Sequence, residues 1–172
     1  IETPPPNELL VDDAIKSTDD LQRLLNASYN EVANTFGGFA PLMSEMQSDN
    51  LSMPNNNDLK ELYSHNVLFF NTTSGSFYSI LYRAIFRANF VQDNMDKVAD
   101  LSAADKDRMM GEIKFIRALC HFTAVRMYAK PYGFSAKNEH PGIAVVLKSS
   151  TKPNPRLSVG EAYDAILADL KD

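Results

Sequence analysis

The sequence predicts a mostly α-helical domain with little or no β-sheet. Apolar residues recur at the three- and four-residue spacing of a helix face in stretches 18–36, 77–89, 102–129 and 158–170. The second and third stretches are long enough to pack against each other, and a capping box precedes the last one. A chain of 172 residues buries roughly 70% of its unfolded surface on folding, so we expect one domain.

The first part of the chain predicts an extended lead-in and two helices. Residues 1–17 include PPPNEL, in which consecutive prolines fix φ and remove backbone donors. A helix is predicted from Thr18, which can cap it, with acidic residues directly after the cap. Gly37-Gly38 is expected to end this helix, and a short second helix is predicted over Ala40–Gln47.

Residues 48–74 show no sustained helical periodicity and are predicted to form a long loop, which is typical of functional or disordered segments.

Two long helices follow. The first has apolar residues on two faces, which implies burial from both sides. The second is expected to begin at Ser102, to run to about Ala129 and to pack antiparallel to the first. One face of the first of these two helices comprises Phe77, Leu81, Ala84 and Ala88. The other face comprises Tyr78, Tyr82, Ile85 and Asn89.

The last helix is predicted to start at the capping box Ser158-Val159-Gly160-Glu161, after a looser crossing segment that contains IAVVL. Its apolar face includes Tyr163, Ile166 and Leu170, and nothing earlier in the chain is an obvious partner for it. We therefore expect the partner helix to lie beyond residue 172 and the isolated chain to self-associate through this face.

Composition argues against several classes of function. A net charge of −5 without a basic block disfavours nucleic acid as a partner. The one cysteine excludes an internal disulfide and any multi-thiolate metal centre. No apolar run approaches the roughly 20 residues that span a bilayer, and the first residues lack a signal-peptide pattern, as in a mature chain.

The stretch GEIKFIRALCHFTAVRMYAKPYG contains the most reactive side chains, Cys120 and His121. Adjacent positions on a helix point about 100° apart and cannot converge on one ion, so we expect Cys120 to be a small buried apolar residue. Lys114, Arg117 and His121 form a polar stripe that is expected to pair with carboxylates on a neighbouring helix. No metal motif, phosphate loop or catalytic motif is present, so the sequence predicts no metal, no cofactor and no enzyme.

The long loop is the better candidate for recognition. Binding a sugar or a peptide needs an apolar ring to stack against and amide or carboxylate groups for hydrogen bonds, and this loop has both. An ordinary surface loop is the alternative. The predicted ligand-binding residues are Asn55, Asn57, Asp58, Tyr63, His65 and Asn66.

Four segments, in order, resemble the N-terminal part of SusD/RagB-type outer-membrane nutrient-binding lipoproteins of Bacteroidetes. TDDLQRLLNASYN is similar to the first helix of that family, and FYSILYRAIFRAN to its helix ending in Ala-Asn. GEIKFIRALCHFTAVRMYAKPYG and RLSVGEAYDAILADLKD resemble two later helices. The match is tightest at Asn89, Glu112, Arg117 and Ala118.

The resemblance implies tetratricopeptide-like helix pairs and a non-catalytic, surface-exposed outer-membrane protein. Such a protein delivers oligosaccharides to a SusC-like TonB-dependent transporter, and it contacts the membrane only through a lipid anchor that these 172 residues lack. Residues 1–172 would be the N-terminal helical domain, without the C-terminal half that supplies much of the ligand site. Peptide capture of the RagB kind, and a scaffold that mainly docks to the transporter, are the alternatives.

Two departures from the family pattern leave the ligand class open. The chain has no Trp, so any stacking ring must be Tyr or Phe, or lie outside these residues. The segment Gly142-Ile143-Ala144-Val145 lacks the proline that relatives often carry there.

Overall fold

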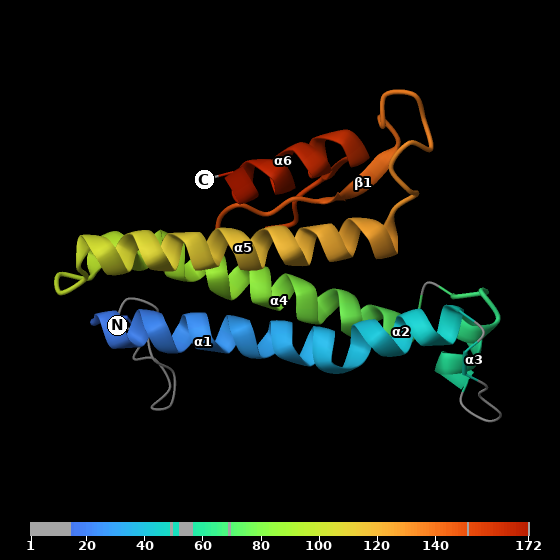
Figure 1. The fold of residues 1–172 in the computed structure, drawn as a ribbon, viewed down its shortest axis with the longest axis horizontal. Coiled ribbons are helices and arrows are strands. Elements are labelled where there is room, and N and C mark those ends of the chain that lie inside the picture. Colours follow the sequence, from blue (N-terminus) through green and yellow to red (C-terminus); the bar gives the residue numbers. More distant parts are fainter. Residues whose placement is uncertain (1–14, 49, 52–56, 69, 151, 172) are drawn as a thin grey trace, which may run out of the picture.

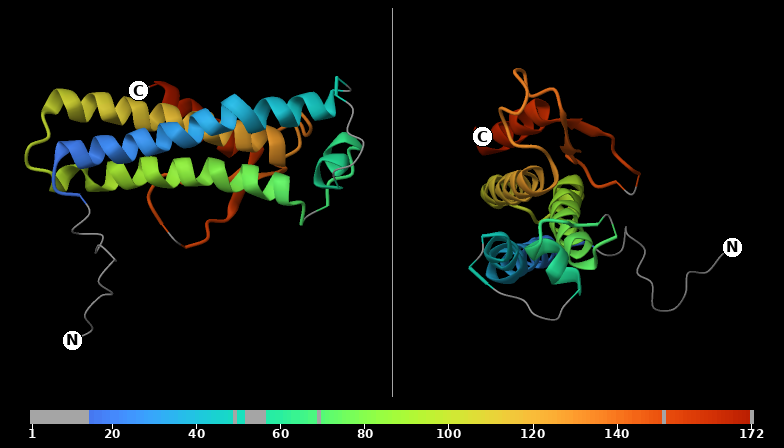
Figure 2. Two further views of the ribbon diagram at one scale, coloured as in Figure 1. Left: turned by 90° about the horizontal axis from the view of Figure 1, so that it is seen from below. Right: turned by 90° about the vertical axis from the view of Figure 1, so that its right-hand side faces the viewer.

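Three long helices lie side by side, and a fourth packs on the last of them (Figures 1 and 2). The computed structural model describes residues 15–48, 50–51, 57–68, 70–150 and 152–171. The long helices are α1 (Thr18–Asn34), α4 (Thr72–Asn94) and α5 (Ala103–Tyr128), and α6 (Val159–Lys171) packs on α5. A 3-10 turn, η3 (Met95–Lys97), follows α4.

The mostly α-helical class is confirmed. Within the described residues, strand structure is limited to β1 (Pro141–Ala144) and β2 (Arg156–Ser158), which pair antiparallel with an irregular register. Gly142 permits the close approach of these strands, because a Cβ there would lie 2.9 Å from the backbone of Leu157 and Ser158. The pair holds the crossing segment against the end of α5 and the start of α6.

The helix starts follow local hydrogen bonding. Ser17 rather than Thr18 caps α1, because Ser17 is extended and its side chain accepts from the backbone N–H of Asp20 at 3.3 Å. The predicted cap at Ser102 is confirmed. The capping box of α6 is also confirmed, since Ser158 N–H donates to Glu161 at 2.8 Å and Glu161 N–H donates to the Ser158 hydroxyl at 3.2 Å.

The prediction that Gly37-Gly38 ends the first helix is wrong. The helix continues through a π-helical turn, η2 (Thr35–Phe39), directly into α2 (Ala40–Gln47). Pro41 has no N–H to donate to the carbonyl four residues earlier, which disfavours ordinary α-helical pairing here. The π turn instead pairs the Ala40 N–H with the Thr35 carbonyl.

The segment expected as a loop over 48–74 contains a helix, α3 (Asn57–Tyr63), and its last residues begin α4. Leu62 of α3 packs with Met43 and Met46 of α2 in a small hydrophobic cluster. A helix of two turns is marginal by itself, so these tertiary contacts stabilise it rather than its own sequence pattern.

The main core lies where α1, α4 and α5 meet. The predicted stripe Phe77, Leu81, Ala84 and Ala88 is buried there, and so is Cys120. Each fully buried large apolar side chain contributes roughly 1.5–3 kcal/mol. Apolar contacts among α1, α4 and α5, including the predicted pairing of α4 with α5, therefore contribute much of the stability of the fold.

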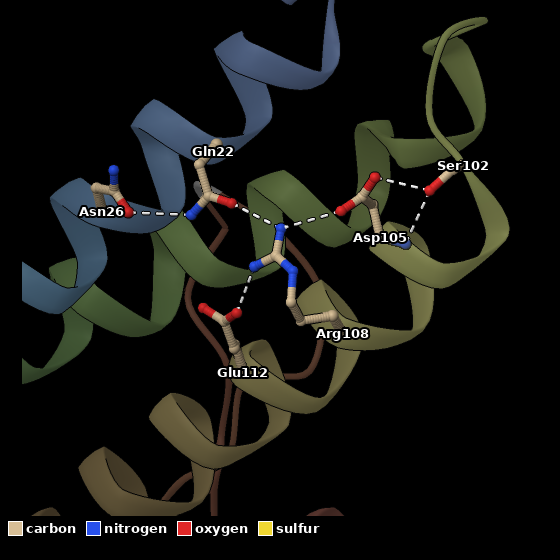
Figure 3. A network of polar contacts seen from close by, with 6 residues as sticks. All are labelled: Gln22, Asn26, Ser102, Asp105, Arg108 and Glu112. Atoms are coloured by element: carbon tan, nitrogen blue, oxygen red, sulfur yellow. Dashed lines mark hydrogen bonds and ion pairs between the residues drawn. The ribbon is translucent and has the colours of Figure 1, made fainter.

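Arg108 of α5 forms hydrogen bonds that link α5 to α1 (Figure 3). It donates to Gln22 of α1 at 2.8 Å and to Glu112, one turn along α5, at 2.5 Å, and it lies 3.4 Å from Asp105. Gln22 in turn donates to Asn26 at 3.0 Å. Exposed ion pairs contribute only about 0–1 kcal/mol to the free energy of unfolding. We therefore expect this network to orient α1 and α5 and to add little to the stability of the fold.

The buried guanidinium of Arg117 joins α5 to α4, to α6 and to the crossing segment. It makes two hydrogen bonds to the carboxylate of Asp169 in α6, at 2.7 and 2.5 Å. It also donates to Asn89 and Gln92 of α4, both at 2.9 Å, and to the Leu147 carbonyl at 3.2 Å. The predicted pairing of this polar stripe with a carboxylate on a neighbouring helix is thus confirmed for Arg117.

Two neighbours of Arg117 fix the crossing segment at Val146. The amide of Asn89 donates to the Val146 carbonyl at 2.9 Å, and the Val146 N–H donates to Nε2 of His121 at 3.1 Å. His121 is therefore an acceptor, which requires its neutral form. Burial lowers the pKa of His121 to about 4; Arg117 also lowers it, and Asp169 opposes the shift.

The apolar face of α6 is only partly unpaired. Ile166, expected to be exposed, is buried against α5, because α6 lies along that helix. Phe115, Phe122, Leu167 and Leu170 are exposed beside it, around a groove of about 260 Å³ between the two helices. Self-association through this face stays a prediction.

Removing Arg117 should be costly. Arg117→Met leaves the Asp169 carboxylate buried without its partner and is expected to lower the free energy of unfolding by about 3–5 kcal/mol. Urea denaturation followed by circular dichroism measures this. Arg117→Met/Asp169→Leu should be more stable than the single variant, and Arg108→Met, at an exposed pair, should cost less than about 1 kcal/mol. Equal losses for Arg117→Met and Arg108→Met would contradict the assignment.

His121 should make stability depend on pH. Its folded pKa of about 4 lies below the ordinary 6.5, so between these values the unfolded chain binds a proton that the folded chain excludes. The free energy of unfolding should therefore fall by roughly 3 kcal/mol as the pH drops from 6.5 to 4. Above pH 6.5 the stabilising contribution of neutral His121 is fully present. Denaturant titrations at several pH values across this range measure the effect. This pH dependence should disappear in His121→Gln and persist in His65→Gln, because His65 is exposed.

Candidate functional site

The structure describes five of the six residues that the sequence predicts as a ligand site. Asn55 lies outside the described residues, and Asn57 and Asp58 form the start of α3. Tyr63 ends α3 and packs against the small cluster beside α2. His65 and Asn66 are exposed in the turn that follows. The residues that line the nearby depression described below include none of the six.

That turn has a defined backbone. His65 adopts a φ of 54°, a left-handed conformation, and its N–H donates to the Leu62 carbonyl at 3.1 Å. The Asn66 N–H donates to the Glu61 carbonyl at 3.0 Å. These bonds end α3 and turn the chain toward the start of α4.

The side chain of Glu61 links this turn to α4. Its carboxylate accepts from the side-chain amide of Asn71 at 2.8 Å and from the Leu68 N–H at 3.3 Å. Asn71 in turn caps α4, because its side-chain oxygen accepts from the Ser74 N–H at 2.9 Å. This chain of contacts fixes the residues on either side of Phe70, whose ring is 65% exposed.

Phe70 stands at the rim of an open depression of about 710 Å³ at the start of α4. The helix contributes three hydroxyls, from Thr72, Ser76 and Ser79. It also contributes the guanidinium of Arg83, which lies 3.2 Å from the carboxylate of Glu31 in α1. The lining residues are Phe70, Asn71, Thr72, Gly75, Ser76, Ser79, Ile80 and Arg83.

This set of groups suits a neutral polar ligand. An exposed ring offers a flat apolar face, while hydroxyls and a guanidinium offer directional hydrogen bonds. None of the eight lining residues is Asp, Glu, His or Cys, so the depression itself holds no general acid, base or thiol nucleophile. Among the described residues no group of three His, Cys, Asp or Glu side chains is placed to hold a metal ion.

Sequence reasoning missed Phe70, Ser76, Ser79 and Arg83. A signal was present for Phe70, because FFNTTSG places aromatic residues directly before hydroxyl and amide residues. The apolar periodicity of α4 predicts which of its faces is buried. It does not show that its exposed first turns border a depression.

Cys120 and His121 do not form a site. Burial raises the pKa of the Cys120 thiol to about 12, so the thiol stays protonated at neutral pH. A protonated, enclosed thiol is a poor nucleophile and a poor metal ligand. Both side chains are structural parts of the interior, as expected from their adjacent positions on one helix.

The chain is similar to one family over its whole length. Residues 1–172 match a SusD-like family model described as "Starch-binding associating with outer membrane". A SusD-like protein of Formosa agariphila is 42% identical over 48 residues, which are 28% of this chain and 9% of that protein. Among the described residues no helix has the length and apolar character to cross a lipid bilayer.

Solved structures show the same fold. A SusD superfamily protein from Bacteroides vulgatus superposes with a TM-score of 0.77 at 19% identity, over 91% of this chain and 37% of that one. Another, from Bacteroides thetaiotaomicron, superposes with a TM-score of 0.75 at 18% identity, over 90% of this chain and 36% of that one. The chain thus spans little more than a third of the length of these two relatives.

The thiol of Cys120 should be inert in the native protein. Incubation with Ellman's reagent at pH 8 is expected to give almost no colour, because the thiol is both buried and protonated, and stoichiometric release in urea. Rapid labelling without denaturant would show that this part of α5 is accessible. A Ser64→Cys variant, exposed after α3, serves as the reactive control in which one thiol reacts quickly.

Proposed function

The chain belongs to the SusD-like family, and from this membership we propose that it takes part in capturing oligosaccharides at the cell surface without catalysing a reaction. The glycan is then passed to a TonB-dependent outer-membrane transporter, and a lipid anchor outside residues 1–172 attaches the protein to the membrane. The observation that carries the proposal is the family match, which covers every residue of the chain.

The depression at the start of α4 supports a glycan as the ligand. A sugar ring presents a flat apolar face and several hydroxyls, which correspond to the exposed Phe70 ring and to the polar groups of Ser76, Ser79 and Arg83. Its open form suits one portion of a longer chain better than a small molecule that must be enclosed.

A binding role, rather than hydrolysis, agrees with the lining of the depression. Glycoside hydrolysis uses two carboxyl groups about 5–5.5 Å or 6.5–9.5 Å apart across the scissile bond. None of the residues that line this depression is Asp or Glu.

The turn after α3 extends the same surface in this proposal. His65 and Asn66 are exposed a few residues before Phe70, and Asn57, Asp58 and Tyr63 belong to the helix that precedes them. We propose that the exposed members of this turn contact the part of the glycan that extends beyond the depression. The peptide and docking alternatives have no specific contact in their favour.

Phe70 should matter for glycan binding. Calorimetric titration of residues 1–172 with maltoheptaose, chosen from the starch-binding description of the family, is expected to show weak binding, because much of the ligand site would lie outside these residues. Phe70→Ala should weaken it about 5- to 30-fold, roughly 1–2 kcal/mol, because the stacking face is lost. Phe134→Ala removes a similarly exposed ring elsewhere, 57% against 65%, and should change nothing.

Xylohexaose and laminarihexaose extend the same test to other glycan classes. The proposal predicts that at least one of the three oligosaccharides binds and that Phe70→Ala weakens it. Binding of trialanine with no response to any oligosaccharide would contradict a glycan and favour peptide capture.

A further inference from the structure

A second aromatic surface lies on the neighbouring face of α4. Tyr78, Tyr82 and Phe86 follow one another at four-residue spacing, which places their rings in a row along the helix. The rings of Tyr78 and Tyr82 stack with centroids 4.3 Å apart, and Tyr128 of α5 meets Tyr78 edge-on at 5.1 Å. Tyr78 and Phe86 remain 37% and 38% exposed.

Hydrogen bonds fix the two tyrosines whose rings contact Tyr78. The hydroxyl of Tyr82 donates to the Ala144 carbonyl at 2.7 Å, and that of Tyr128 donates to the Ser74 carbonyl at 2.7 Å. Tyr78 lies between these two anchored rings. A surface that is already ordered costs a ligand less conformational entropy on binding.

The crossing segment forms the opposite wall of a cleft of about 380 Å³. Figure 2 shows the segment, in orange-red, running past α4. It is tethered there because the backbone N–H and the hydroxyl of Ser149 both donate to Asp93, at 2.7 and 2.6 Å. Lys152, Pro153 and Asn154 are exposed along this wall.

We propose that this cleft is a second oligosaccharide subsite, in which a sugar ring stacks on Tyr78 and Phe86 and its hydroxyls bond to Lys152 and Asn154. This inference rests on the proposed function and adds a position to it. The aromatic row supplies the stacking face, and the polar wall supplies an ammonium and an amide for neutral hydroxyls. With a single basic residue and no acidic one in its lining, the cleft favours a neutral ligand over a highly charged one.

The two subsites lie on neighbouring faces of the same helix. Ser79 lines the first depression and Tyr78, the residue before it, lines the cleft. From Ser76 to Phe86 the helix rises by roughly 15 Å, so one extended oligosaccharide can reach both places. Such a chain gains affinity from the second contact without a second encounter from solution, so maltoheptaose should bind more tightly than maltotriose.

The test uses residues 1–172 labelled with 3-fluorotyrosine, with the Tyr78 fluorine resonance assigned from the Tyr78→Phe variant. Maltoheptaose is expected to shift the Tyr78 resonance. Phe86→Ala should weaken maltoheptaose binding about 5- to 30-fold. Phe134→Ala is the control for losing an exposed ring, and circular dichroism checks that each variant is folded.

Lys152→Ala/Asn154→Ala tests the opposite wall without touching the helix. It should weaken maltoheptaose in the same direction as Phe86→Ala, and it keeps the test decisive if Phe86→Ala does not fold.

The outcomes separate this inference from the proposed function. Binding that depends on Phe70 alone, with the Tyr78 resonance unmoved and the wall variant unchanged, would overturn the second subsite and leave glycan capture intact. Failure of the three oligosaccharides to bind at all would overturn both. A Tyr78 resonance that responds to trialanine and to none of the oligosaccharides would make the cleft a peptide site and overturn the inference.

Discussion

The arrangement of the last third of the molecule depends on one buried guanidinium. Arg117 holds α6 through Asp169, contacts α4 through Asn89, and reaches the crossing segment at Leu147. Burying a charged group is costly unless the group is paired with an opposite charge and its hydrogen bonds are satisfied. Few other placements of α6 would satisfy the guanidinium in this way. The apolar core brings α1, α4 and α5 together, and this polar node then fixes where α6 and residues 141–158 lie against them.

Much of the fold could be predicted from local signals. Apolar periodicity identified α1, α4, α5 and α6, and side-chain caps located the starts of α5 and α6, because both signals act within one or two turns of helix. The errors arose where tertiary contacts outweigh local preference. Gly37 and Gly38 stay helical because a π turn accommodates Pro41 after them, and α3 exists because Leu62 packs on α2. Burial of Ile166 likewise depends on how α6 lies on α5.

The candidate surfaces were harder to predict, since a sequence does not show what covers an aromatic ring. Tyr78 and Tyr82 were assigned to one buried stripe, yet Tyr82 bonds beneath the crossing segment while Tyr78 stays partly open. Phe70 lies a few residues after Asn66, which local composition did select, but its exposure depends on how the chain is arranged between α3 and α4. A depression forms between elements, whereas periodicity describes each element separately.

The π turn between α1 and α2 changes the direction in which the side chains of α2 point. One extra residue per turn rotates every later side chain by about 100° relative to an uninterrupted α-helix. Met43 and Met46 thus meet Leu62 of α3 in a cluster distinct from the main core. Because opening that cluster leaves most contacts of the long helices in place, the α2–α3 end can exchange its amide hydrogens in a low-energy local event while the bundle stays closed.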